Sequence, residues 1–219
     1  MPNPEIYTEL IKICQPYGAT LVTVSKTRTE REVMSIYKLG QRIFAENRVH
    51  ELIIKAELLP SDIEWHLIGH LQTNKVKSII PYVHCVQSLD SWKLWEKIDE
   101  EAKVADKQID CLLQIKVAVE ETKHGWDKNE LDHVLSSALY LAFSNIRLCG
   151  VMGMASLTSD KEQVRKEMKQ LKNYFDSLKQ TYFKDAEHFN MLSMGMSGDY
   201  QIALEEGSTM IRVGSLLFE

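Results

Sequence analysis

The sequence has 219 residues, of which 44% are hydrophobic and 26% charged, as in an ordinary soluble globular protein. Its formal net charge is -5, and acidic and basic residues are mixed along its length. Nucleic-acid-binding proteins usually carry a basic surface, so we do not expect that function. The start of the chain lacks the pattern of a signal peptide, and no apolar run approaches the roughly 18 residues of a transmembrane helix. We expect a cytoplasmic protein that binds neither nucleic acid nor membrane.

The predicted elements follow one another in a regular order. The first segment predicts a short amphipathic helix that begins at Pro4 and ends at Pro16-Tyr17-Gly18. Apolar stretches that predict strands then recur at residues 20–25, 41–47, 63–69, 83–88, 110–119, 146–154, 188–197 and from 209 onward. Helical patterns lie between them, at 29–39, 48–58, 72–80, from Asp90 onward, and at 128–142, 160–182 and 198–207.

The apolar stretches are nearly continuous rather than alternating, which indicates strands buried on both faces of a parallel sheet. An open doubly wound sheet and a closed barrel both fit that pattern. About eight strand-then-helix units in about 200 residues match the small end of the (β/α)8 barrel range. No Ser/Gly-rich linker interrupts the chain. We therefore predict an α/β fold with one domain over residues 1–219, a TIM-type (β/α)8 barrel with an extra N-terminal helix.

The cysteines are spread along the chain and form no Cys-x-x-Cys pair. Three of them fall inside predicted strands and are expected to be buried, reduced thiols: Cys85, Cys111 and Cys149. Cys14 lies in the first predicted helix. This thiol pattern suits the reducing cytoplasm.

In a (β/α)8 barrel, catalytic and binding groups gather at the carboxyl ends of the strands. Here those ends carry a lysine, an amide, histidines, an arginine and two Gly/Ser turns: Ser25-Lys26, Glu46-Asn47-Arg48, His66 to His70, Gln87-Ser88, Lys116, Met152-Gly153-Met154, Ser193 to Ser197, and Arg212 to Ser215. The turns SMGMSGD and RVGS follow the last two strands, where such turns commonly bind a phosphate through backbone N–H groups. Neither turn matches a Walker or a dinucleotide motif, and most glycine turns are only tight connections.

Lys26 follows a buried strand without a break. Most lysines are exposed and have no specific role. An amine in a barrel mouth, however, would lose hydration and would more often be neutral and nucleophilic. Such an amine forms Schiff bases with carbonyl compounds. A lysine beside phosphate-binding turns suggests pyridoxal 5'-phosphate (PLP), an aldehyde that carries a phosphate.

The histidines give no recognised metal motif. His66 and His70 straddle a strand end and a glycine instead of sharing one helix face. The H-E-x-x-H pattern is absent, so we expect no zinc site there. The other histidines are expected at the surface or at helix caps: His50, His84, His124, His133 and His188. The methionines near strand ends are expected to pack around the barrel mouth: Met152, Met154, Met191, Met194 and Met196.

Five longer motifs carry a resemblance: VSKT, FAENRVHEL, WHLIGHLQTNK, LSMGMSGDY and EEGSTMIRVG. Through them the chain resembles the YggS/PROSC family of PLP homeostasis proteins over essentially its whole length. The resemblance implies a fold like the barrel domain of bacterial alanine racemase and eukaryotic ornithine decarboxylase, without their second, β-rich domain. Two positions depart from the pattern, since many members have glycine where this chain has Ala45 and many end in glycine where it ends in Glu219.

The resemblance also implies roles for individual residues. Lys26 would form the Schiff base with PLP, Asn47 would lie beside the cofactor ring, and Arg212 would face the pyridine nitrogen. The phosphate would be held by Ser193, Ser197, Gly214 and Ser215. His66 and Met152 would line the pocket.

Arg212 has a chemical consequence in that arrangement. A guanidinium only donates hydrogen bonds, so the pyridine nitrogen would accept one and stay unprotonated. The ring would then be a poor electron sink, which disfavours transamination. Alanine racemases take a tyrosine base from the second domain of a partner subunit, whereas this chain ends at Glu219, soon after the eighth strand. We therefore expect a monomer in which one face of PLP is open to solvent, with no proton donor above it.

Three functions remain open at this point. The first is a non-catalytic PLP carrier that buffers the cofactor or delivers it to apo-enzymes, in vitamin B6 and amino-acid homeostasis. The second is a weak PLP-dependent amino-acid racemase. The third is a barrel that binds an unrelated phosphorylated compound, because one fold hosts many functions.

Overall fold

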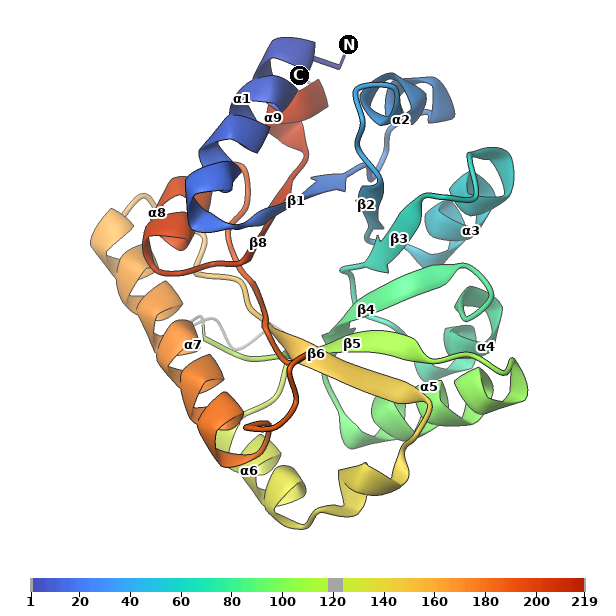
Figure 1. Ribbon diagram of the computed structural model, residues 1–219, viewed down its shortest axis with the longest axis vertical. Helices are drawn as coiled ribbons and strands as arrows, with labels where there is room; N and C mark the ends of the chain where they lie inside the picture. Colours follow the sequence, from blue (N-terminus) through green and yellow to red (C-terminus); the bar gives the residue numbers. More distant parts are fainter. Residues whose placement is uncertain (1, 118–123, 219) are drawn as a thin grey trace.

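The strands form a closed parallel barrel in a computed structural model that describes residues 2–117 and 124–218. Each strand pairs with its neighbour in chain order (Figure 1). The strands are β1 Thr20–Val24, β2 Ile43–Glu46, β3 Glu64–Leu67, β4 Val83–Leu89, β5 Ile109–Gln114, β6 Ile146–Met152, β7 Met191–Ser193 and β8 Met210–Val213. The barrel closes where β8 pairs with β1. The predicted (β/α)8 fold is confirmed.

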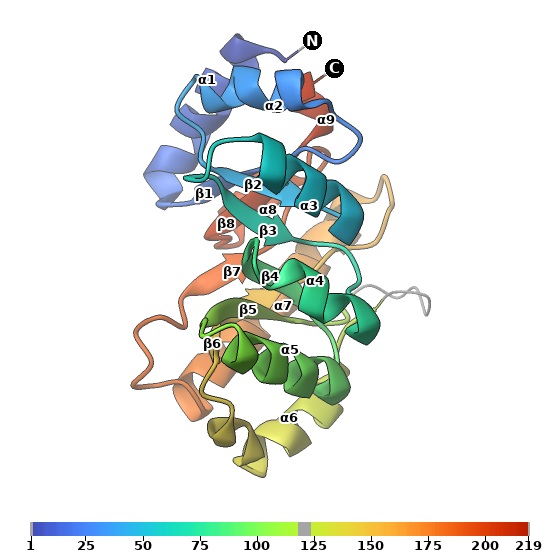
Figure 2. The same ribbon diagram turned by 90° about the vertical axis from the view of Figure 1, so that its right-hand side faces the viewer.

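Helices form an outer layer around the barrel (Figures 1 and 2). The α-helices are α1 Pro4–Cys14, α2 Glu30–Tyr37, α3 Val49–Leu58, α4 Val76–Ile79, α5 Trp92–Val104, α6 Lys128–Ser136, α7 Lys161–Thr181, α8 Tyr200–Glu205 and α9 Ser215–Phe218. Short 3₁₀ helices lie at Gln15–Tyr17, Thr73–Lys75 and Leu139–Ala142. Within the described residues, no helix combines the length and the apolar character needed to cross a membrane.

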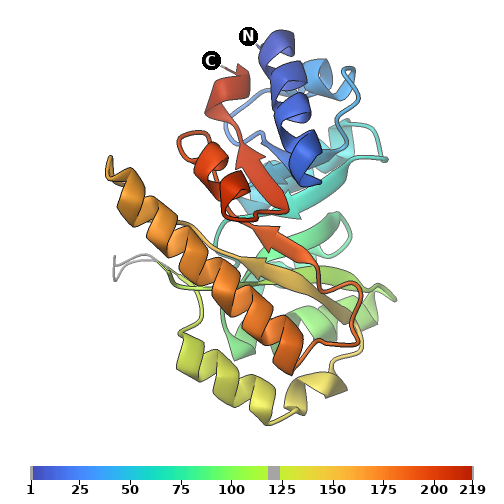
Figure 3. The same cartoon turned by 60° about the vertical axis from the view of Figure 1, so that its left-hand side comes forward.

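Local sequence signals explain where the main helices begin. Thr29 and Glu32 form a capping box at the start of α2, in which each side chain accepts a hydrogen bond from the other residue's backbone N–H. Asp160 caps α7 by accepting from two backbone N–H groups of its first turn. α7 then runs along one side of the barrel (Figure 3) and buries an apolar stripe that includes Leu171 and Phe175.

The termini of the described chain lie together on one side of the barrel (Figure 1). α1 lies beside α9, and Asn3 N donates a hydrogen bond to Leu217 O at 2.8 Å. The extra N-terminal helix therefore covers the side of the barrel where the chain also finishes, next to the β1–β8 closure.

The core has two layers because successive strand residues point to opposite faces. The larger layer packs between the strands and the helices, and includes Phe44, Trp65, Trp95 and Phe189. The inner layer fills the barrel with two small clusters: Val22, Val24, Ala45 and Met210, and Cys85, Leu112, Cys149 and Met152. The expected burial of the strand thiols is confirmed, and burial raises the pKa of each of them.

Some predicted boundaries are wrong. The helix expected at 128–142 ends at Ser136, since Ala138 has a φ of 57° and a 3₁₀ turn follows. The strand expected at 188–197 contracts to β7, and the residues after Ser193 form a turn. The helix expected at 72–80 is split into a 3₁₀ turn and the short α4. Part of the stretch expected as strand at 110–119, residues 118 and 119, lies outside the described residues.

Candidate functional site

A cavity of about 530 Å³ opens at the carboxyl ends of the barrel strands. This volume is in the usual range for a small-molecule site. Six of the nine residues predicted for the site line it: Lys26, Asn47, Ser197, Arg212, Gly214 and Ser215. The other three, His66, Met152 and Ser193, are buried in the barrel interior and are not in the cavity lining. The cavity thus brings together Arg212 from β8 and residues from the loops after β1, β2, β7 and β8.

Lys26 lies in the turn after β1 and is exposed. The expected dehydration of its amine is wrong, because the last buried residue of this segment is Ser25 and Lys26 already stands at the open rim. The next residue, Thr27, has a φ of 63°, which is uncommon for a β-branched residue. Its backbone N–H donates to Glu51 Oε2 at 2.9 Å, and this bond to α3 holds the turn in place.

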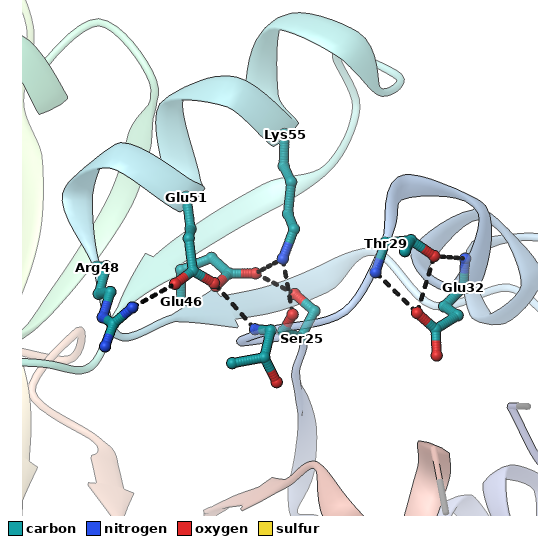
Figure 4. A network of polar contacts seen from close by, with 8 residues as sticks. Ser25, Thr29, Glu32, Glu46, Arg48, Glu51 and Lys55 are labelled. Atoms are coloured by element: carbon teal, nitrogen blue, oxygen red, sulfur yellow. Dashed lines mark hydrogen bonds and ion pairs between the residues drawn. The ribbon is translucent and has the colours of Figure 1, made fainter.

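A buried ion pair connects this turn to the neighbouring strand (Figure 4). Lys55 Nζ lies 2.6 Å from Glu46 Oε1 and donates to Ser25 O at 2.7 Å. Ser25 Oγ donates to the same Glu46 oxygen at 2.7 Å. Burial raises the pKa of the Glu46 carboxyl, while the hydrogen bonds from Lys55 and Ser25 act in the opposite direction. The network therefore joins the residues that immediately precede Lys26 and Asn47.

Asn47 is half-buried and directly follows β2. The loop after β3, which contains Gly69, passes very close to its backbone. A Cβ at Gly69 would lie 2.1 Å from Asn47 O, so only glycine allows this approach. Gly69 itself lines the cavity. The backbone of the β3 loop thus limits how Asn47 can be placed.

The turns after β7 and β8 form another wall of the cavity. Gly214 N donates to Ser197 Oγ at 3.4 Å, which connects the two turns. A Cβ at Gly214 would lie 2.8 Å from Val24 O, so glycine is required for the turn to pack against β1. Ser197 is half-buried and Ser215 is exposed, so both hydroxyls lie at the rim.

Arg212 is a buried cation that donates hydrogen bonds to two uncharged groups, while the negative charge of Asp199 acts on it electrostatically. Its guanidinium donates to Ser193 Oγ at 2.6 Å and to Gly153 O at 3.0 Å. Burial lowers the pKa of the guanidinium to about 10, so it stays charged at neutral pH. Arg212 also lines the cavity and places positive charge at its base.

A hydrogen-bonded chain continues from Arg212 into the barrel. Ser193 Oγ donates to Gln87 Oε1 at 2.7 Å, and Gln87 Nε2 lies 2.8 Å from His66 Nδ1. Burial lowers the pKa of His66 to about 3, so the ring is neutral. Gln87 Nε2 is therefore the donor and His66 Nδ1 the acceptor. Ser193 and His66 are thus connected to the cavity-lining Arg212 by a chain of hydrogen bonds.

Several residues of this site were not predicted from the sequence. Glu46 and Gln87 were recognised only as strand-end residues, and Lys55 and Glu51 were not singled out. Four further cavity residues were not assigned to the pocket: Gln114, Gly69, His70 and His124. Gln114 could have been found, because it is the last residue of β5, whereas the expected residue at that strand end, Lys116, is not in the cavity lining. Met154 and Met196 line the cavity, as expected for methionines at the barrel mouth.

Comparison with known proteins decides the family. The alanine racemase N-terminal domain model matches residues 7–219. The pyridoxal phosphate homeostasis protein of Synechocystis sp. is 36% identical over 220 residues, which cover 100% of this chain and 98% of that protein. This chain belongs to the pyridoxal phosphate homeostasis protein family.

Other members of the pyridoxal phosphate homeostasis protein family agree with that result. The Escherichia coli K12 protein is 30% identical over 93% of this chain and 86% of its own length. PipY of Synechococcus elongatus PCC7942, solved with PLP bound, has a TM-score of 0.89 at 31% identity, and the match covers 99% of this chain and all of PipY. Alanine racemase of Clostridium difficile shares the fold alone, with a TM-score of 0.75 at 15% identity over 96% of this chain and 55% of the racemase.

Proposed function

We propose that this chain binds PLP through a Schiff base on Lys26 and buffers or delivers the cofactor without catalysing a reaction of its own. The observation that carries the proposal is one cavity lined by Lys26, by Arg212 and by the two Gly/Ser turns. The PLP-bound structure of PipY, which is similar over nearly the whole chain, supports it. The relatives are named for pyridoxal phosphate homeostasis, which supports a role in vitamin B6 homeostasis, and we extend this role to amino-acid homeostasis as part of the proposal.

The residues present fit PLP in size and in charge. A cavity of about 530 Å³ can hold a small phosphorylated ring compound. Lys26 offers a primary amine, and Arg212 offers a guanidinium that donates hydrogen bonds and can face the pyridine nitrogen. Ser197, Gly214 and Ser215 bring hydroxyl and backbone groups from the turns after β7 and β8, where we place the phosphate.

The positions of the other predicted residues in the structure suggest how each would contact PLP or support the site. Asn47, fixed beside Gly69, would contact the cofactor ring. Ser193 would orient Arg212 and not touch the phosphate, since its hydroxyl is already engaged below the cavity. His66 and Met152 would support the floor of the site from inside the barrel.

The chemistry of the Arg212 side chain favours a PLP carrier over an enzyme that forms a carbanion on PLP. Its buried guanidinium has only donors, so a pyridine nitrogen placed against it would remain unprotonated. PLP supplies electron-withdrawing power most strongly when that nitrogen is protonated. Arg212 would therefore hold the cofactor and at the same time keep it weakly reactive.

A second candidate, a weak amino-acid racemase, is favoured by one observation. His70 and His124 line the same cavity as Lys26, so the site contains two imidazoles that can transfer protons, whereas the sequence led us to expect no proton donor above PLP. Incubation of the PLP-loaded protein with a single enantiomer of alanine tests this candidate. Turnover well above that of free PLP, lost in His70→Ala, would establish it.

The main proposal is tested by adding PLP to the purified protein and recording the visible absorption of the Schiff base. We expect a band that is absent in Lys26→Ala and kept in Lys116→Ala, because Lys116 is an exposed lysine after β5 outside the cavity lining. Borohydride reduction followed by mass spectrometry should locate the modification at Lys26. Labelling elsewhere, with Lys26 unmodified, would overturn the assignment.

Delivery requires a separate measurement. The loaded protein is mixed with an apo form of a PLP-dependent enzyme, and recovery of that enzyme's activity is followed. Recovery faster than the measured dissociation of PLP from this chain indicates direct transfer. Recovery at the dissociation rate limits the role to buffering.

A further inference from the structure

Three potential metal ligands meet at the mouth of the cavity. His70 Nδ1 lies 2.9 Å from Asp90 Oδ2, and His124 Nδ1 lies 3.8 Å from the same oxygen. One ligand atom of each residue lies within 4.8 Å of those of the other two. The two imidazole rings are stacked, with centroids 4.0 Å apart. Among the described residues, this is the group of His, Cys, Asp and Glu side chains that could hold a metal ion.

The three residues come from three consecutive strand-end loops. His70 follows β3, Asp90 follows β4 and His124 follows β5. The Asp90 side chain is 7% exposed, whereas the side chains of His70 and His124 are 42% and 58% exposed. The barrel topology thus brings a largely buried carboxylate and two accessible imidazoles together at the cavity.

Hydrogen bonding alone explains only part of this arrangement. A bond from the His70 ring to Asp90 accounts for the 2.9 Å contact. The 3.8 Å separation of His124 from Asp90 is beyond hydrogen-bond range, so the second imidazole, stacked on the His70 ring, lies beside the carboxylate without a hydrogen bond to it. A cation that accepts all three groups as ligands accounts for both approaches.

The donor set and its spacing match a divalent transition metal. Two imidazole nitrogens and one carboxylate oxygen are a donor set that suits Zn²⁺ and similar ions, with one or more positions left for water or substrate. Ligand bonds of about 2.0–2.1 Å at a tetrahedral ion place neighbouring donor atoms roughly 3.3 Å apart. The observed separations lie on both sides of that value, and rotation of the exposed His124 ring can close the larger one.

We propose that His70, Asp90 and His124 bind one divalent transition metal ion, Zn²⁺ or an ion of similar preference, at the mouth of the cavity. His70 and His124 both belong to the cavity lining, so the open positions of the ion face the space that Lys26 and Arg212 also line. Oxygen donors of a ligand in the cavity, such as a carboxylate or a phosphate, can complete its coordination. The positive side chains in the cavity, Lys26 and Arg212, repel a metal cation at its mouth. An anion bound between them and the metal offsets this repulsion and should therefore strengthen metal binding.

The test uses untagged, chelator-treated protein carrying Lys26→Ala, titrated with ZnCl₂ in a calorimeter. This background separates the metal site from PLP attachment, so failure of either proposal leaves the other readout intact. Titration with CoCl₂ adds a visible spectrum that reports nitrogen coordination. The ligand variants are Asp90→Asn, His70→Ala and His124→Ala, and the matched control is His133→Ala, an exposed histidine on α6.

We expect one Zn²⁺ per chain, with affinity lowered by at least about tenfold in each ligand variant and unchanged in the control. His124→Ala, at an exposed position, keeps the test valid if Asp90→Asn does not fold. The proposal is overturned if the parent chain binds no stoichiometric Zn²⁺ at micromolar concentrations. It is equally overturned if the ligand variants bind as the control does.

Discussion

Lys55 Nζ and Glu46 Oε1 are 2.6 Å apart, and their side chains are only 5% and 0% exposed. The pair joins α3 to the end of β2, and Ser25 binds both members at the end of β1. The residues that follow these strands in the chain are Lys26 and Asn47. Among the described residues, the second Glu46 oxygen has no hydrogen-bond partner, so the carboxylate depends on one oxygen for all of its contacts. The ion pair therefore holds the carboxyl ends of β1 and β2 in a fixed position relative to each other.

Replacing Lys55 with methionine should destabilise the protein by about 3–5 kcal/mol, because it leaves the buried Glu46 carboxylate without its cation. Urea unfolding measures the change. The double variant Lys55→Met with Glu46→Gln should recover a large part of the loss, since no charge then remains buried. A single variant as stable as the parent would show that the carboxylate is already neutral.

Folding stability should depend on pH through His66. Burial lowers the pKa of His66 to about 3 in the folded state, with a smaller effect from His84, and Asp110 opposes both. The unfolded value is about 6.5, so between these values the unfolded state binds more protons. The free energy of unfolding therefore rises with pH across this range, and stability is lost as the pH falls from about 6.5 toward 3, with a slope of at most about 1.4 kcal/mol per pH unit from this residue.

His66→Gln removes the titrating group and keeps an acceptor for Gln87. Urea unfolding of both proteins at several pH values below 6.5 should show a flatter dependence for the variant. Parallel curves for parent and variant would contradict the burial of a neutral His66.

Two glycines of the cavity wall allow a matched comparison. A Cβ at Gly214 would lie 2.8 Å from Val24 O, whereas a Cβ at Gly198 meets no atom within 4 Å. Gly214→Ala should therefore destabilise the protein by about 1–3 kcal/mol through overpacking. Gly198→Ala should be neutral or slightly stabilising. Thermal unfolding of the two variants checks this, and equal behaviour would contradict the close packing of the β8 turn against β1.

The placement of Arg212 against the ring nitrogen predicts a spectroscopic effect. Arg212→Glu introduces an acceptor that favours a protonated ring nitrogen, so the visible band of Lys26-bound PLP should shift. Arg212→Lys keeps a donor and a positive charge and should shift the band less. Near-ultraviolet circular dichroism verifies that each variant is folded, because Arg212 also contacts Ser193 and Gly153. An unchanged band in folded Arg212→Glu would refute the placement.

Much of the fold could be predicted because a barrel strand leaves a strong local signal. Continuous apolar runs such as Leu21 to Val24 arise wherever both faces of a strand are buried, and that signal needs no knowledge of neighbours. Boundaries were predicted less well. The end of α6 depends on a positive φ at Ala138, and the shortness of β7 depends on the turn that follows Ser193, neither of which periodicity reports.

Strand-end position was a good guide to the cavity but not to each side chain. Ser193 and Ser197 stand in the same short motif, yet Ser193 points into the barrel toward Arg212 while Ser197 lies at the rim. That difference arises because Ser193 is the last residue of β7 and Ser197 is in the turn after it. The sequence motif contains both serines, but it does not show that one points into the barrel and the other lies at the rim.

The sequence by itself determined the order of strands and helices and the residues that stand where each strand ends, because burial and capping act over a few neighbouring positions. Tertiary structure decided which of those residues lie next to one another around the cavity. Lys55 reaches Ser25, and His124 reaches Asp90, only because consecutive βα units lie side by side around a closed barrel. Contacts between side chains from different loops depend on barrel closure and on side-chain direction, and neither property is contained in a local pattern of residues.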